Sequence, residues 1–177
     1  MGDHHSLAWL SRVLCAIFRR VPSEERGGIT LPAGPCWEIS PPRDLDSFLR
    51  ALADAVPPDS VLYVECTSVA IEIRLYLESR KIQPTTTVAV GTLWPRPHRF
   101  HIPVTRENLE GLAQLAERHA EPEVADHLHV YRNNQVLLQW YDAPSEPLYV
   151  STDISEDKLK AFCTRLGTDY RPAVWKA

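Results

Sequence analysis

The apolar residues recur with two periods along the chain, one typical of helices and one typical of strands. Helical spacing at i, i+3 and i+4 predicts helices over 6–21, 41–56, 69–77, 106–115 and 156–166. Short alternating or continuous apolar runs predict strands over 36–39, 61–64, 85–93, 100–104, 127–132, 135–141 and 148–150. The order is mixed and includes a hairpin. We therefore expect an α+β fold with a mixed, largely antiparallel sheet and helices packed mainly on one face.

Capping residues mark several of the expected helix ends. Thr67 or Ser68 is expected to cap the third helix, and Thr105 the fourth. Gly167 is expected to close the last helix in a left-handed conformation. The remaining residues, 168–177, are interpreted as an irregular tail.

The length of 177 residues predicts a single domain over 1–177. Within it, the amphipathic helix at 6–21 is joined to the body by a Gly- and Pro-rich loop over 22–36. This helix either packs on the domain, as an ordinary apolar stripe does, or serves as a partner or membrane-surface helix.

Three strand-helix units resemble one another in the apolar pairs that open their helices. The pairs are Leu45/Phe48, Leu109/Leu112 and Leu159/Phe162. They are compatible with repeated βα (ferredoxin-like) units, but any capped helix after a strand has this pattern.

A tight hairpin is predicted at Asn133-Asn134, because asparagine tolerates the positive φ that a two-residue loop requires. A regular ladder from this loop would divide the side chains between two faces of the sheet. One expected face carries His127, His129, Tyr131, Val136, Leu138 and Trp140. The other carries Leu128, Val130, Arg132, Gln135, Leu137 and Gln139.

The face with His127, His129, Tyr131 and Trp140 is a candidate surface for a ligand or a partner, because such side chains suit a half-wet environment. The alternative is that a helix or the tail covers it. Two histidines at i and i+2 on a strand also suit a metal ion, but a closed zinc site needs about four ligands. No third and fourth ligand is evident, so no metal is expected.

The turn that begins with Trp94-Pro95-Arg96 is a second candidate for partner binding. Two prolines stiffen it, and tryptophan and arginine are enriched in interface hot spots. The alternative is that Trp94 folds back onto the sheet edge with Arg96 stacked over it.

Cys66 is the candidate nucleophile, because it follows the most apolar strand and precedes an expected helix. A helix N-terminus lowers the pKa of a nearby thiol. No base is placed beside it by the sequence, however, and a free cysteine is usually a small core residue.

Composition and charge narrow the function classes. The net charge of −4 and the lack of a long Lys/Arg run argue against nucleic-acid binding. No run of 18 apolar residues occurs, so no membrane span is expected. The four cysteines are far apart, which favours a reducing, cytoplasmic location. No nucleotide-binding or hydrolase motif occurs, so no cofactor is expected.

The sequence therefore favours a non-catalytic interaction or regulatory module that binds a protein or a small ligand. Its binding element would be the aromatic sheet face or the Trp94 turn. The alternative is a thiol-dependent enzyme with Cys66 as nucleophile. Association with further copies of the chain stays open.

Overall fold

The structure is a computed structural model and describes residues 27–176. In chain order its elements are β1 Gly34–Ile39, α2 Leu45–Ala55, β2 Val61–Cys66, α3 Ile71–Arg80, β3 His98–Pro103, α4 Arg106–Ala116, the short 3₁₀ helix η2 Glu121–Glu123, β4 His127–Arg132, β5 Gln135–Trp140, β6 Leu148–Ser151, α5 Glu156–Leu166 and β7 Tyr170–Trp175.

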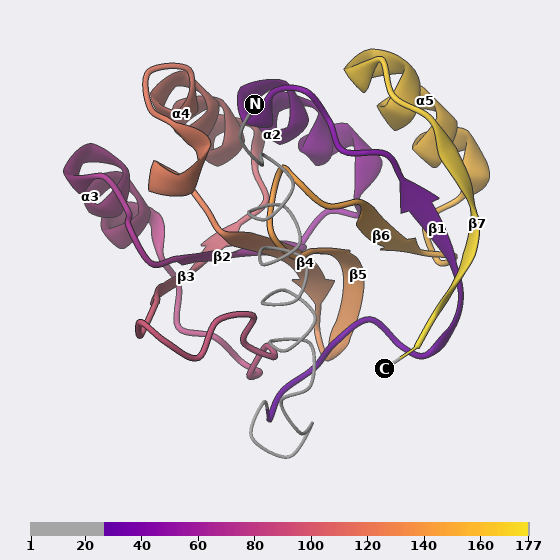
Figure 1. Cartoon of the computed structure of the whole chain (residues 1–177), viewed down its shortest axis with the longest axis horizontal. Helices are drawn as coiled ribbons and strands as arrows, with labels where there is room; N and C mark the ends of the chain where they lie inside the picture. Colours follow the sequence, from indigo (N-terminus) through magenta and orange to yellow (C-terminus); the bar gives the residue numbers. More distant parts are fainter. Residues whose placement is uncertain (1–26, 177) are drawn as a thin grey trace, which may run out of the picture.

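The seven strands form one sheet in the order β3-β2-β4-β5-β6-β1-β7. Every neighbouring pair in this sheet is antiparallel. Helices α2, α4 and α5 lie on one face, and α3 lies beside α4 at the β3 end (Figure 1). The expected α+β class, the antiparallel pairing and the helices on one face are confirmed.

The main core lies between these helices and the sheet. Helix α2 presents an apolar stripe that includes the fully buried Phe48 and Leu52. Helix α4 begins as predicted, since the Thr105 hydroxyl accepts a hydrogen bond from the Asn108 N–H. Helix α5 ends as predicted at Gly167, whose φ of 62° is left-handed.

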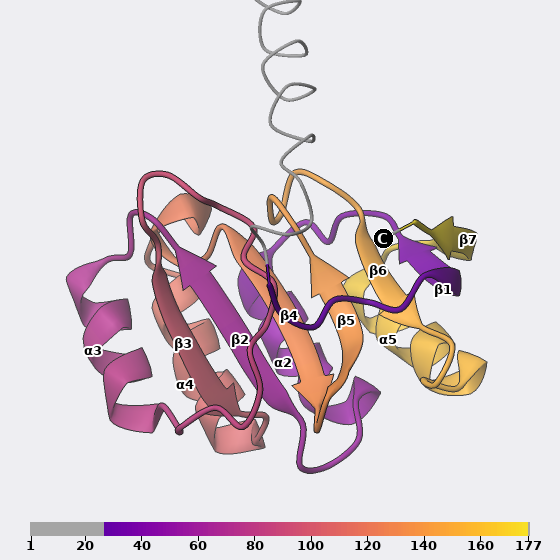
Figure 2. The same ribbon diagram turned by 90° about the horizontal axis from the view of Figure 1, so that it is seen from below.

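The opposite face of the sheet is covered by two irregular segments, 27–33 and 84–93, which we call the cover. Figure 2 shows both segments passing in front of the central strands. They hydrogen-bond to each other, because the Ile29 N–H donates to Thr87 O at 2.8 Å and the Ala89 N–H donates to Ile29 O at 2.9 Å. A second, smaller core of Leu31, Cys36, Tyr63, Val88, Tyr131 and Val136 lies on this covered side.

The strand predicted at 85–93 is therefore wrong, since only an isolated bridge between Ile29 and Val88 forms there. Its β-branched residues favour a flat, half-buried environment. In the structure only Val88 among them is fully buried, since the segment lies across the sheet instead of pairing at its edge.

Two further expectations about local structure are wrong. Helix α3 begins at Ile71, after an Ala70 cap, so neither Thr67 nor Ser68 caps it. The Thr67 N–H and hydroxyl donate instead to the Asp126 carboxylate, at 2.6 and 2.8 Å. The tail at 168–177 contains strand β7, which pairs with β1 along six residues.

Other expectations are not decided by the structure. The predicted helix at 6–21 lies outside the described residues, and the loop predicted at 22–36 is described only from residue 27 onward. The strand order does not confirm repeated ferredoxin-like units. None of the helices within residues 27–176 has the length and apolar character needed to cross a bilayer.

Candidate functional site

The β4–β5 hairpin places the predicted aromatic residues on two different faces. Its first two pairs match the predicted register, and Asn133 has the positive φ of 55° that the turn requires. A register shift then occurs between Val130 and Tyr131, so His129 pairs with Gln139 and Leu128 with Trp140. The predicted faces are therefore wrong beyond the shift, because one extra residue turns the rest of β5 over.

Trp140 consequently lies on the helix side, away from the histidines. It has no exposed surface and packs against Phe48, with ring centroids 4.8 Å apart. Its indole Nε1–H donates to Glu146 O at 2.7 Å. Trp140 is thus a core residue with a satisfied donor, and its geometry gives no access to a ligand.

The covered face does bring His127, His129 and Tyr131 together, with three further aromatic residues from β2, from β3 and from the end of β5. The His129 ring lies 5.5 Å from Tyr63 and 4.8 Å from Tyr141, measured between centroids. All three predicted residues are almost fully buried, His129 with 1% of its surface exposed. We call His101, His127, His129, Tyr63, Tyr131 and Tyr141 the aromatic cluster.

Burial governs the protonation of this cluster. Loss of solvation lowers the pKa of His129 to about 3, with a smaller contribution from the nearby His127. Burial, together with Arg99, lowers the pKa of His101 to about 4. Burial also raises the pKa of Tyr63, assisted by the adjacent Glu65 carboxylate. His129 and His101 are therefore neutral at pH 7.

Glu65 joins the cluster to the cover and was missed from the sequence. Its fully buried carboxylate accepts hydrogen bonds from the Tyr63 hydroxyl at 2.6 Å and from the Thr92 N–H at 2.6 Å. The Gly91 N–H also donates to it, at 3.1–3.2 Å. One feature could have revealed it: a lone charged residue within the otherwise apolar run of β2.

His127 forms a second connection between the sheet and the cover. Its Nδ1 accepts the Asp142 N–H at 2.9 Å, so we assign the ring proton to Nε2. Nε2 then donates to the Thr92 hydroxyl, 2.8 Å away. Thr92 is consequently held by both Glu65 and His127.

Gly91 permits this close contact between cover and sheet. A Cβ atom at this position would lie 2.1–2.6 Å from three atoms of the His127 ring. No side chain fits there without displacing the ring or the cover.

The Trp94 turn, by contrast, is on the surface. Trp94 is 85% exposed and its neighbour Leu93 is 43% exposed, so Trp94 does not fold back onto the sheet edge. Arg96 is also exposed and is not stacked on a ring of the described residues. We call residues 93–97 the Trp94 loop; its base is the Thr92 that Glu65 and His127 hold.

The chain around the Trp94 loop is basic, although the protein carries a net charge of −4. Between residues 79 and 106 there are five Lys and Arg residues and no Asp or Glu. No acidic side chain within residues 27–176 lies within ion-pair distance of Arg96 or Arg99. The loop thus combines exposed apolar surface with unpaired positive charge.

Cys66 lies in an environment that disfavours the thiolate. It is fully buried, and its Sγ–H donates to Pro122 O at 3.3 Å. Burial raises the pKa of the thiol to about 11, and the Asp126 and Glu123 carboxylates act in the same direction. The expected lowering by a helix N-terminus is wrong, because α3 begins five residues later.

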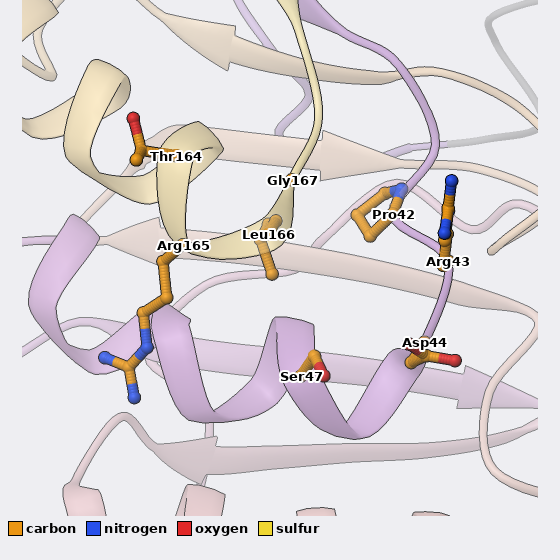
Figure 3. Close-up of a pocket in the computed structure, with 8 residues that line it drawn as sticks. All are labelled: Pro42, Arg43, Asp44, Ser47, Thr164, Arg165, Leu166 and Gly167. Atoms are coloured by element: carbon orange, nitrogen blue, oxygen red, sulfur yellow. The ribbon is translucent and has the colours of Figure 1, made fainter.

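The surface carries two shallow hollows away from the Trp94 loop. A hollow of about 340 Å³ lies between the start of α2 and the end of α5, where Figure 3 shows Arg43 and Arg165 pointing away from each other. A second, of about 350 Å³, lies beside His101 between β3 and residues 81–84. No group of three or more potential metal ligands occurs within residues 27–176.

The structure therefore separates the predicted binding residues into three groups. His127, His129 and Tyr131 are gathered beneath the cover, Trp140 is in the opposite core, and Trp94 and Arg96 are at the surface.

Comparison with models of known protein families found no match, and searches of curated proteins and of solved structures found none either.

Proposed function

We propose that this protein is a non-catalytic protein-binding module whose binding element is the Trp94 loop. The observation that carries the proposal is an 85% exposed tryptophan next to a loop base held by a buried carboxylate. A large exposed aromatic side chain is unfavourable in isolation and is the kind of residue that forms interface hot spots.

The attachment of the loop supports binding because it reduces the entropy lost on association. Thr92 is held by Glu65 and His127, and Pro95 and Pro97 restrict the backbone on both sides of Arg96. A loop that is ordered before binding loses less freedom when it meets a partner.

Charge complementarity favours a partner with an acidic surface beside an apolar recess. Trp94 and Leu93 would enter the recess, and Arg96 and Arg99 would pair with carboxylates around it. The overall charge of −4 argues against nucleic acid as the partner. A buried, protonated Cys66 gives no support to the enzyme alternative.

We also propose that the protein acts in the cytoplasm as a single domain. Cys36, Cys66 and Cys163 are free and buried, which suits a reducing compartment.

Site-specific photo-crosslinking tests the binding role. A photoreactive phenylalanine analogue replaces Trp94 in one protein and Val174 in a matched control, since Val174 is also exposed but lies on β7 at the far end of the sheet. Both are irradiated in an extract of the source cells, and the adducts are identified by mass spectrometry. We expect a distinct protein adduct from position 94 that position 174 does not give.

The affinity of the purified partner for variants of this protein then tests whether Trp94 is a hot spot. Trp94→Ala should weaken it by at least about thirtyfold, the loss typical of a hot spot, whereas Val174→Ala should change it less than about twofold. Arg96→Glu should weaken it further if the partner surface is acidic. Adducts that are equal at both positions, adducts only to nucleic acid or to a second copy of the chain, or an affinity unaffected by Trp94→Ala would each overturn the proposal.

A further inference from the structure

Polar contacts to a few buried side chains hold the cover on the sheet. Besides the contacts to Glu65 and His127, the Gln139 Oε1 accepts the Thr30 hydroxyl at 2.6 Å and the Leu31 N–H at 3.0 Å. The cover therefore depends on three polar residues of the sheet.

The surface beneath the cover is incompletely satisfied. Both ring nitrogens of His129 lack a hydrogen-bond partner within residues 27–176, and so does the Nε2 of Gln139. These two side chains are cross-strand neighbours on the covered face. Buried polar groups without partners oppose closure, because water would satisfy them once the cover lifted.

Protonation of His129 is also strongly disfavoured while the cover is closed. The titratable groups that face it are Tyr63 from β2, Tyr141 after β5 and His127 on its own strand, and none supplies a free negative charge. Glu65 is already engaged by the cover. Segments 27–33 and 84–93 contain no titratable side chain at all. A charged His129 would thus be buried without a counter-charge.

His101 is in a similar position at the edge of the cluster. Its Nδ1 lies 3.0 Å from the Tyr131 hydroxyl, and its ring packs on Tyr63. Arg99 on its own strand and Lys81 in the adjoining hollow are both positive. Protonation of His101 is therefore also disfavoured in the closed arrangement.

We propose that the cover is an acid-released latch: uptake of protons by His129 and His101 lifts segment 84–93, which frees the Trp94 loop and exposes the aromatic cluster. The idea that this latch regulates binding rests on the proposed function of the Trp94 loop. The opening of the cover itself does not depend on that function. The aromatic sheet face and the Trp94 loop would then change together. In the closed state the face is covered and the loop is attached, and in the open state the face is exposed and the loop is released.

The sign of the effect follows from proton linkage. The pKa values of His129 and His101 are lowered in the closed state to about 3 and about 4, and opening returns them toward the ordinary value of about 6.5. Closure is therefore favoured above about pH 6.5 and is lost as the pH falls. Between pH 7.5 and 5.0 the ratio of open to closed should rise about thirtyfold for each histidine that is released.

Amide hydrogen exchange, followed by NMR, tests the latch on the whole chain without any partner. Protection factors, which are corrected for the intrinsic pH dependence of exchange, are measured for Gly91 and Thr92 and for Val130 in the central strand β4. We expect Gly91 and Thr92 to lose at least about thirtyfold in protection between pH 7.5 and 5.0. Val130, which reports global unfolding, should stay more strongly protected than Gly91 and Thr92 at both pH values, because the latch opens without unfolding the sheet.

The variant His129→Phe removes one of the two titrating groups, and His119→Phe, at a histidine outside the cluster, is its matched control. His129→Phe should reduce the pH response of Gly91 and Thr92 by about thirtyfold, whereas His119→Phe should leave it unchanged.

Protection at Gly91 and Thr92 that is independent of pH would overturn the latch, as would protection at these two amides equal to that of Val130 at both pH values. An unaltered response in folded His129→Phe would also overturn it. If that variant does not fold, the comparison of Thr92 with Val130 in the wild-type chain decides. A latch that opens as expected in a protein without a Trp94-dependent partner would refute the proposed function alone.

Discussion

The Thr92 hydroxyl lies 2.8 Å from the His127 Nε2, and this hydrogen bond joins the base of an exposed loop to a buried strand of the sheet. The Glu65 carboxylate accepts the N–H of the same threonine at 2.6 Å. Thr92 thus connects the aromatic cluster to the Trp94 loop. Substitutions in the cluster and in the loop should therefore differ in their effects on stability and on amide exchange.

Trp94 and Trp140 should differ sharply in their effect on stability. Trp94→Ala removes an 85% exposed ring and should change the free energy of unfolding by less than about 0.5 kcal/mol. Trp140→Ala removes a fully buried ring packed on Phe48 and should cost about 3–5 kcal/mol. Urea denaturation measures both. Equal losses for the two variants would contradict the assignment of their environments.

Gly91→Ala should destabilise the attachment of the cover. The new Cβ would overlap the His127 ring, so ring or cover must move, at a cost of about 1–3 kcal/mol. Gly27→Ala is the matched control, because a Cβ there meets no atom within 4 Å. Urea denaturation gives the cost and exchange of the Thr92 amide shows where it arises. A wild-type exchange rate in Gly91→Ala would show that the cover does not need the glycine.

Glu65→Gln should also loosen the cover. The amide replaces one acceptor oxygen with a donor, which would face either the Tyr63 hydroxyl or a backbone N–H. Hydrogen bonds to a charged group are worth about 1.5–3 kcal/mol, so we expect a loss in that range. Glu38→Gln, which breaks the exposed pair with Arg171, should cost less than about 1 kcal/mol. A larger effect at Glu38 than at Glu65 in urea denaturation would count against this assignment.

Global stability should fall on acidification for the same reason as the latch opens. Unfolded histidines take up protons near pH 6.5, whereas the folded-state pKa values of His129 and His101 are about 3 and about 4. The unfolded chain binds more protons in this window, so the urea midpoint should decrease from pH 7 toward pH 4. His129→Phe should give a shallower decrease than wild type. A midpoint that rises in this window would contradict the burial of neutral histidines.

The buried cysteines should react slowly with a thiol reagent at pH 7. Burial raises the pKa of Cys66 and of Cys163 to about 11, so little thiolate is present and access is restricted. Peptide mapping after a timed exposure measures the extent of labelling at each position. Labelling of Cys66 should become fast only in urea. Fast labelling of Cys66 in the native protein would support the enzyme alternative.

The sequence by itself determined most of the helices and strands, because periodicity, caps and turns depend on residues that are close together in the chain. The helical and alternating periods predicted the four described helices and six of the seven strands, within a few residues at each end. Thr105, Asn133 and Gly167 each have the backbone geometry that their residue type favours. These properties depend on neighbours only a few residues away in the chain.

The site depended on contacts between distant segments. A register shift of one residue in the β4–β5 hairpin moved Trp140 to the opposite face from His129, and no local pattern marks that shift. The β-branched run at 85–93 lies across the sheet with one isolated bridge to Ile29, although its composition equally suits a strand. Glu65 is acceptable in the core only because Gly91 and Thr92, 26 and 27 residues away, bring their N–H groups to it. The sequence thus determined which residues could form such a site, and tertiary packing alone decided which of them meet beneath the cover and which reach the surface.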